Sequence, residues 1–165
     1  MASLGERPLE EHDDHLQRAI AMALRFIGYR PRSEMEVRAR LARRFSPEVV
    51  QTTVDWLKNS GYLDDVAFAE AWVSSRQRSR PRAIALVSWE LRNKGVARDH
   101  IAEAVAVMDD QELACNAARL VARRFYKADD ALFRRRMWAY LRRRGFPHAL
   151  IAITVGCVEE EVKGD

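Results

Sequence analysis

The side chains most able to do chemistry in this sequence are three pairs of adjacent aspartates, at Asp64-Asp65, Asp109-Asp110 and Asp129-Asp130. Paired carboxylates hold divalent metal ions in many nucleases. Each pair, however, stands just before or within the first turn of an expected helix, where aspartate accepts hydrogen bonds from free backbone amides and complements the helix dipole. No His or Lys recurs beside the pairs to complete a catalytic set. We therefore interpret the pairs as helix caps, with a metal-dependent nuclease as the weaker alternative.

The histidines and cysteines offer no better chemistry. His12-Asp13-Asp14-His15 resembles a metal-binding cluster, but an acidic tail is more typical of a solvated segment. His100 and His148 both stand near the start of an expected third helix, which indicates equivalent structural positions. Cys115 and Cys157 form no CxxC motif, as expected of reduced thiols in an intracellular protein without disulfides. Without a nucleophile motif or a phosphate-binding glycine loop, we expect no catalytic residue, no metal and no cofactor, and hence no enzyme.

Basic residues gather where helices are expected to end, notably in the run Arg142-Arg143-Arg144. The negative end of a helix dipole accounts for one or two such cations, each contributing about 0.3–1 kcal/mol. The additional run Arg134-Arg135-Arg136 exceeds that requirement, so a binding surface is favoured. Trp138 either contacts a partner there or packs against a neighbouring unit, and the sequence leaves both possibilities open. The candidate surface comprises Arg43, Arg44, Arg78, Arg80, Arg82, Arg92, Lys94, Arg123, Arg124, Arg134, Arg135, Trp138, Arg142, Arg143 and Arg144.

The overall charge agrees with an anionic partner. The chain of 165 residues carries a net charge of +4, with a pI near 9.4, and its acidic residues collect near the two termini. A nucleic acid or an acidic protein groove would both suit such a distribution. The N-terminus lacks the apolar segment of a signal peptide, and no stretch approaches 18 apolar residues. We therefore expect a cytoplasmic protein without a membrane partner.

A period of about fifty residues organises the chain. Val50, Val54 and Leu57 recur as Ile101, Val105 and Met108 and again as Ile151, Val155 and Val158, always at positions that line one helical face. Upstream pairs such as Val37 and Leu41 shift by the same fifty residues. Ser33 begins a capping box, and Gly61, Gly95 and Gly145 mark helix ends. No alternating pattern predicts strands.

The sequence therefore predicts an all-α fold with nine helices in three tandem three-helix repeats that form an elongated, curved array. We expect a disordered acidic N-terminal tail at 1–13, followed by repeats at 14–60, 61–109 and 110–160, and a C-terminal tail at 161–165. An array of this kind would present its basic positions along an extended surface.

Four linked segments, within a region of roughly 16 to 160, resemble the RecX family. They are Arg32 to Val37, Gly61 to Ala69, Glu90 to Val96 and Leu141 to Phe146, and the segment Gly61-Tyr62-Leu63-Asp64-Asp65-Val66-Ala67-Phe68-Ala69 is the most specific. The chain departs from the family at Arg80-Pro81-Arg82, a connection that commonly carries a glycine there. The arginine runs of the third unit are a second difference.

This resemblance implies a curved helical protein that lodges in the groove of the RecA filament on DNA. It would inhibit filament extension, ATP hydrolysis, strand exchange and coprotease function of RecA, in DNA repair and the SOS response. We expect a monomer that binds the RecA filament and could also contact single- or double-stranded DNA. The alternative from the residues alone is a stand-alone DNA-binding helical module, since arginine clusters also suit phosphate contacts.

Overall fold

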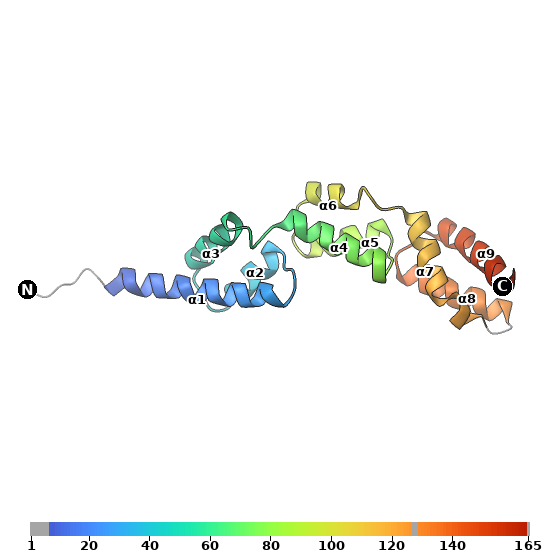
Figure 1. The fold of residues 1–165 in the computed structure, drawn as a ribbon, viewed down its shortest axis with the longest axis horizontal. Helices are drawn as coiled ribbons and strands as arrows, with labels where there is room; N and C mark the ends of the chain where they lie inside the picture. The colour runs from blue at the N-terminus through green and yellow to red at the C-terminus, as the bar shows by residue number, and fades with distance from the viewer. Residues whose placement is uncertain (1–6, 127–128, 165) are drawn as a thin grey trace, which may run out of the picture. The chain divides into compact units, whose positions relative to one another are not determined.

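The computed structural model of this protein describes residues 7–126 and 129–164, with side chains from Asp13 onward. These residues form nine α-helices and no strand, which confirms the all-helical class (Figure 1). The helices are α1 (Arg7–Tyr29), α2 (Glu34–Leu41), α3 (Pro47–Asn59), α4 (Asp65–Ser79), α5 (Ile84–Asn93), α6 (Arg98–Val105), α7 (Asp110–Phe125), α8 (Asp130–Arg143) and α9 (His148–Gly164).

The chain divides into two compact units that exchange short segments. The first unit comprises the residues up to Ala69 together with Arg92–His100, and the second comprises Glu70–Leu91 together with the residues from Ile101 onward. All three boundaries between the units fall inside helices, namely α4, α5 and α6, rather than in connecting loops. Each unit therefore contains residues from two of the repeats expected from the fifty-residue period.

The core of the first unit lies where α1, α2 and α3 pack against one another. Small residues on α1, Ala19 and Ala23, are completely buried and allow the other two helices to approach closely. Val37 and Leu41 from α2 are also fully buried. The remaining members of this core come from α3 and the segment after it: Val49, Val50, Val54, Leu57 and Leu63.

In the second unit, α7, α8 and α9 form the most densely packed group. Alanines on α7, including Ala114, Ala117 and Ala118, are completely buried where α9 packs against it. Phe133 and Met137 from α8 fill the space beside them with no exposed surface. Asp130 and Arg134, near the start of α8, contact Lys163 and Glu159, near the end of α9, so the two helices run antiparallel.

Burial in the second helices follows the predicted fifty-residue period. Val37, Val87 and Met137 are completely buried, and so are the residues four positions later, which are leucine in every case. The local end signals also form as expected. Ser33 makes the reciprocal capping box with Glu36, and Gly61, Gly95 and Gly145 adopt positive φ angles of 73°, 78° and 86°.

Both predicted tails are shorter in the structure than the sequence suggested. Helix α1 begins at Arg7, so residues 7–13 are helical, whereas residues 1–6 lie outside the described part of the chain. Asp14 pairs with Arg18 one turn later at 2.9 Å, an interaction that supports a helix. Helix α9 continues to Gly164 because Glu161 and Lys163 are held by partners on α7 and α8.

Candidate anion-binding site

Four arginines of the candidate surface line one pocket in the second unit. Arg80 and Arg82 come from the connection between α4 and α5, and Arg143 and Arg144 from the end of α8. The hydroxyl-bearing side chains of Ser79 and Tyr140 complete the lining of this pocket, whose volume is about 510 Å³. We call it the arginine pocket. It joins two segments that lie some sixty residues apart, which sequence spacing alone could not show.

Backbone contacts hold the two sides of the arginine pocket together. The amide of Ala83 donates to the carbonyl of Arg144 at 3.0 Å, and the Arg144 guanidinium donates to the carbonyl of Pro81 at 3.2 Å. Gly145 then lies so close that a Cβ atom there would stand 2.9 Å from Cβ of Leu86. The guanidinium of Arg144 also lies 4.2 Å from the centre of the Tyr140 ring, an attractive cation–π geometry. Arg144 is therefore fixed in position before any ligand binds.

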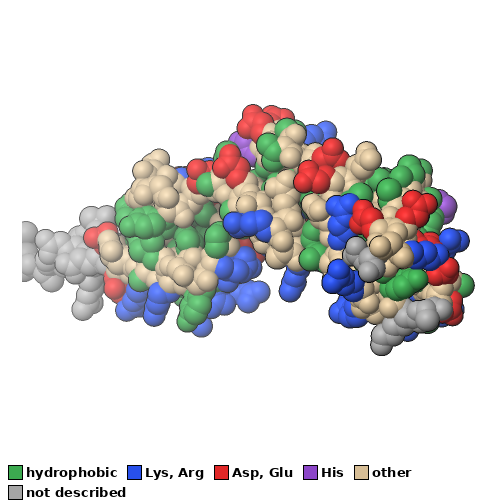
Figure 2. All heavy atoms as spheres, turned by 45° about the vertical axis from the view of Figure 1, so that its right-hand side comes forward, with side chains coloured by type: hydrophobic (Ala, Val, Ile, Leu, Met, Phe, Trp, Pro, Cys, Tyr) green, Lys and Arg blue, Asp and Glu red, His purple; other side chains and the backbone are tan. Residues whose placement is uncertain are grey.

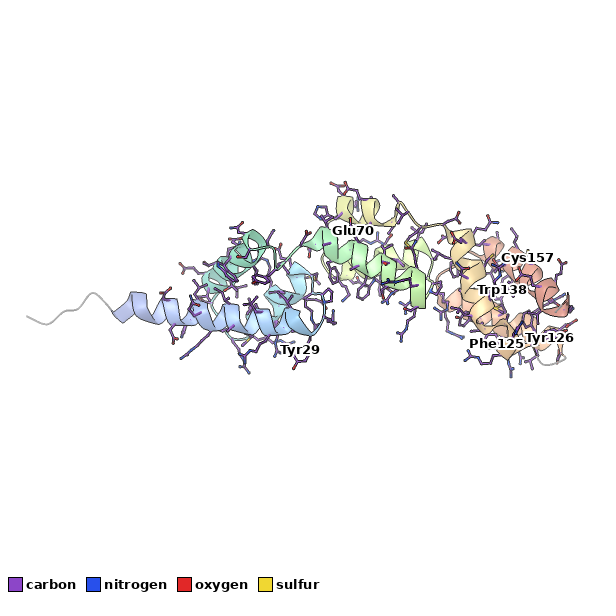
Figure 3. All side chains as sticks on the ribbon, in the orientation of Figure 1. Tyr29, Glu70, Phe125, Tyr126, Trp138 and Cys157 are labelled. Carbon is purple, nitrogen blue, oxygen red and sulfur yellow. The ribbon has the colours of Figure 1, made fainter. Side chains whose placement is uncertain are left out.

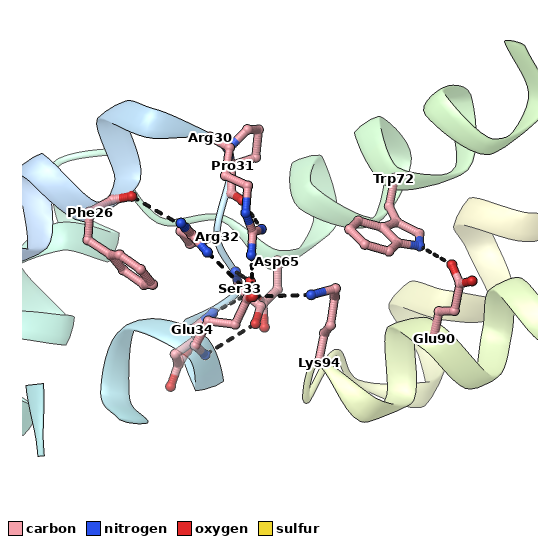
Figure 4. Close-up of polar contacts among 11 residues, drawn as sticks. Phe26, Arg30, Pro31, Arg32, Ser33, Glu34, Asp65, Trp72, Glu90 and Lys94 are labelled. Carbon is pink, nitrogen blue, oxygen red and sulfur yellow. Dashed lines mark hydrogen bonds and ion pairs between the residues drawn. The ribbon is translucent and has the colours of Figure 1, made fainter. Parts of the chain in front are cut away.

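A buried carboxylate supports the other side of the pocket. Glu90 is only 8% exposed and accepts a hydrogen bond from the Trp72 indole at 2.8 Å (Figure 4). It accepts a second one from the Arg76 guanidinium, also at 2.8 Å. Arg82 also pairs with this carboxylate. Loss of solvent around Arg82, together with the charges of Arg76, Arg144 and Arg80, lowers the pKa of that guanidinium. Positive charge is therefore crowded around the arginine pocket. The pairing of Arg76 with Glu90 was not predicted from sequence, because nothing local marks the two residues as partners.

Two cations of the candidate surface also have carboxylate partners within the protein. Arg134 forms a two-point ion pair with Glu159, at 2.6 and 3.2 Å, and this glutamate is almost fully buried. The hydrogen bonds from Arg134 and Lys163 lower the pKa of Glu159. Lys94 donates to Glu36 at 3.1 Å in the first unit (Figure 4). Both residues therefore stabilise contacts between helices.

Trp138, for which the sequence left partner contact and internal packing both open, is half-buried. Its ring meets that of His148 edge to face, with centroids 4.5 Å apart, so α8 and α9 account for its packing (Figure 3). The partner comes from the adjacent helix pair rather than from a neighbouring repeat. The packing within the unit therefore accounts for part of the Trp138 surface, and the rest of it stays exposed.

The remaining predicted cations are exposed but do not line the arginine pocket. Arg44 lines a separate pocket of about 410 Å³ in the first unit, together with Arg18 and Arg25. On the face of the second unit seen in Figure 2, Lys and Arg side chains are interleaved with Asp and Glu, in keeping with ion pairs such as Arg119 with Glu161. The others in this exposed group are Arg43, Arg78, Arg92, Arg123, Arg124, Arg135 and Arg142.

The aspartate pairs act as helix caps, as predicted, and they do more than the sequence indicated. Asp64 accepts hydrogen bonds from the amides of Val66 and Ala67, at 2.8 and 3.1 Å, and so caps its own helix α4. The next residue, Asp65, accepts instead from the amide of Glu34, at 2.9 Å (Figure 4). It thereby caps the distant helix α2.

In the second aspartate pair, too, one residue caps its own helix and the other caps a distant helix. Asp109 caps α7 through the amides of Gln111 and Glu112, and Asp110 accepts from the amide of Ile84 at 2.7 Å. The third pair differs, since Asp129 caps α8 while Asp130 pairs with Lys163. Every carboxylate of the three pairs thus has a partner within the described chain.

A second pocket of the first unit, lined by residues of α2, α3 and the segments after α3 and α5, is unsuited to an anion. Its volume is about 680 Å³, and its cations Arg38 and Lys58 both bind the carboxylate of Glu34, at 2.7 and 2.9 Å. Asp64 and Asp65 add negative charge to the same lining.

Among the residues whose placement is described, no cluster of three His, Cys, Asp or Glu side chains could hold a metal ion. Nor does any helix in that part of the chain have the length and apolar character to cross a membrane.

The described chain is an all-α protein built from short helices. Comparison with known proteins identifies two of its regions as three-helix domains of one family. Residues 19–57 match the family model described as RecX, first three-helix domain, and residues 64–105 match RecX, second three-helix domain. The regulatory protein RecX of Prosthecochloris aestuarii is 33% identical over 144 residues, which cover 87% of this chain and 95% of that protein. The regulatory protein RecX of Mycobacterium avium is 34% identical and covers 81% of this chain and 80% of its own length.

Solved structures show the same fold. A crystal structure of RecX from Lactobacillus salivarius superposes with a TM-score of 0.71 at 17% identity, over 89% of this chain and 98% of the other. A second crystal structure, of a regulatory protein RecX, gives a TM-score of 0.74 at 20% identity, over 93% of this chain and 80% of the other. The chain therefore belongs to the RecX family of regulatory proteins.

Proposed function

We propose that this chain regulates the RecA recombinase by binding the RecA filament on DNA and inhibiting its activities. The family membership across most of the chain carries this proposal. Inhibition would extend to filament growth, ATP hydrolysis, strand exchange and the coprotease function used in the SOS response. The protein would act as a monomer in the cytoplasm, without chemistry of its own.

Differential binding is a sufficient mechanism for such a regulator. A protein that binds one state of the filament more tightly than another shifts the equilibrium toward the first state. In this proposal, three tandem three-helix repeats form an elongated, curved array that spans neighbouring RecA subunits, where a compact domain would reach only one. Exposed arginines such as Arg142 and Arg143 then supply charge toward an anionic groove.

The decisive experiment is a titration of the DNA-dependent ATPase of RecA from the same organism. We expect ATP hydrolysis to fall progressively as the full chain is added, and to recover when excess RecA is supplied. An unchanged ATPase rate at every ratio would rule out the proposed regulation.

A charge-reversal variant tests the contribution of the arginine-rich end of α8. We expect Arg142→Glu with Arg143→Glu to weaken inhibition of the ATPase by roughly tenfold or more, since like charges at an interface cost several kcal/mol. Arg144 is left in place because its backbone and side chain hold the α4–α5 connection. Circular dichroism should show unchanged helical content.

The matched control reverses two exposed arginines outside the candidate surface, Arg25→Glu with Arg98→Glu. It changes the net charge by the same amount, and we expect it to inhibit nearly as well as the natural chain. Equal weakening by both variants would indicate a general charge effect rather than a surface on α8.

The arginine pocket is the one observation that favours the alternative, a helical module that binds DNA without RecA. That function predicts tight binding of DNA by the chain alone, with an affinity that falls steeply with salt. It also predicts no effect on RecA beyond competition for DNA, so inhibition would disappear when DNA is in excess.

A further inference from the structure

The arginine pocket carries more positive charge than its structural surroundings require. Arg80, Arg82, Arg143 and Arg144 line it, and Arg76 stands next to it on the Glu90 carboxylate. Glu90 offsets one of these charges. Two helices, α4 and α8, end at the pocket, and the negative end of each helix dipole is equivalent to roughly half a charge. When the charge of Glu90 and the two helix ends is set against the five arginines, an excess of about three positive charges remains.

Part of this excess faces solvent without a protein partner. Arg80 and Arg143 are exposed, and no carboxylate of the described residues forms an ion pair with either of them. Arg144 binds only a backbone carbonyl and the face of Tyr140. Glu90 offsets one charge through its ion pair with Arg82, and the positive charge that remains in the pocket favours the binding of an anion.

The shape of the lining favours phosphate over a nucleobase. Guanidinium groups present a planar fork of donors that matches phosphate oxygens, whereas the Ser79 hydroxyl in the same lining already donates to the carbonyl of Ser75 at 3.0 Å. Tyr140 is occupied by Arg144 on its face, and the Phe125 ring meets it edge on with centroids 5.9 Å apart. The aromatic surface is therefore already used within the protein. Binding should not depend on base identity.

We propose that the arginine pocket is a binding site for a multiply charged phosphate group. A pyrophosphate, or two successive phosphates of a nucleic-acid backbone, would match the excess charge, and the pocket volume of about 510 Å³ accommodates either. Arg144 and Arg82 are positioned by protein contacts, whereas Arg80 and Arg143 close on the ligand. This site goes beyond regulation of RecA, because a phosphate ligand binds it without RecA.

Inorganic pyrophosphate and a labelled single-stranded oligonucleotide are the two probes that test the site on the full chain. Calorimetry with pyrophosphate should show binding that weakens at least tenfold in the variant Arg80→Gln with Arg143→Gln. These two side chains have no carboxylate partner in the described structure, so the substitutions should leave folding intact. The control Arg25→Gln with Arg98→Gln loses the same charge elsewhere and should bind pyrophosphate as the natural chain does.

The oligonucleotide arm identifies the source of the phosphate. If pyrophosphate displaces the oligonucleotide, and the pocket variant lowers the slope of log affinity against log salt by about 1.4, the site holds two phosphates of the backbone. If pyrophosphate binds without displacing it, the ligand is a free phosphorylated molecule. Unchanged binding of both probes by the pocket variant overturns the proposal. The proposal is also overturned if the pocket variant binds both probes normally but binds an acidic peptide such as oligoglutamate more weakly. That result would assign the pocket to a protein partner.

Discussion

Asp65 and Asp110 show how one side chain can serve a helix other than its own. Each follows an aspartate that caps the local helix. Each accepts a hydrogen bond from the first backbone amide of a helix that begins about thirty residues earlier. Burial raises the pKa of Asp65, while the hydrogen bond from Glu34 acts in the opposite direction. The amide contact is therefore the reason that a carboxylate is tolerated at this half-buried position.

Substitution of this acceptor should reduce stability in a manner that depends on side-chain chemistry. We expect Asp65→Ala to lower the free energy of unfolding by about 1–3 kcal/mol, because the Glu34 amide loses its partner. Asp65→Asn keeps an oxygen at the same place and should cost less than about 1 kcal/mol. Urea denaturation followed by circular dichroism measures both changes.

Asp110 provides a matched pair of variants in the second unit, since it accepts from the Ile84 amide. Alanine and asparagine there should follow the same order. If asparagine proves as damaging as alanine at both positions, the negative charge itself, rather than the hydrogen bond, would be responsible.

At the scale of the elements, the glycines that end α5 and α8 lie closely against neighbouring side chains. A Cβ atom on Gly95 would stand 2.6 Å from Cβ of Met35, and one on Gly145 would stand 2.9 Å from Cβ of Leu86. Gly61 has a similar positive φ but open space around it. Helix termination and close packing are therefore separate requirements, and only Gly95 and Gly145 meet both.

A graded series of alanine substitutions separates these two requirements. Gly61→Ala should lower the free energy of unfolding by about 1–2 kcal/mol, the cost of placing a side chain in the left-handed region. Gly95→Ala and Gly145→Ala should cost more, because the backbone strain is joined by a steric overlap. Thermal unfolding of the three variants gives the order. Equal losses at all three positions would show that the neighbouring side chains yield without cost.

Taken as a whole, the molecule depends on carboxylates that are charged in the folded state. Hydrogen bonds from Lys58 and Arg38 lower the pKa of Glu34 from 4.5 despite partial burial. Burial would raise the pKa of Glu36, but hydrogen bonds from Arg30, Lys94 and Ser33 outweigh it and lower that pKa. Glu159 follows the same direction through Arg134 and Lys163. These groups connect helices that are distant in sequence.

Stability should therefore decrease in acid. A carboxylate whose pKa is lowered on folding stabilises the folded state above its ordinary pKa, and this contribution is lost as the pH falls through the lowered value. We expect the melting temperature to fall between about pH 5 and pH 3. Asp65 acts in the opposite direction, since its pKa is raised, and reduces this loss. Differential scanning calorimetry across this range measures the balance.

The variant Glu36→Gln removes one of the groups concerned. It should be less stable than the natural chain at neutral pH, and its melting temperature should depend less on pH in the acidic range. An identical pH dependence in the two proteins would mean that Glu36 titrates alike in the folded and unfolded states.

Local sequence was sufficient for the all-helical class and for helix ends within the chain, but not for the start of α1 or the end of α9. The spacing of apolar residues identified Val37, Val87 and Met137 as buried, and the capping box at Ser33 and the glycine at 145 formed as predicted. These features depend on residues within one or two turns of each other, where helix geometry fixes which side chains share a face. The family could be recognised from the same short segments.

Tertiary packing decided which basic residues act together. Arg143 and Arg80 line the same pocket. Arg134 instead forms an ion pair with Glu159, and the Trp138 ring packs against that of His148. Nothing in the spacing of these residues distinguishes a free arginine from a paired one. The distinction arises from the angle and register at which distant helices pack, and those depend on the combined shape of many buried side chains rather than on any local pattern.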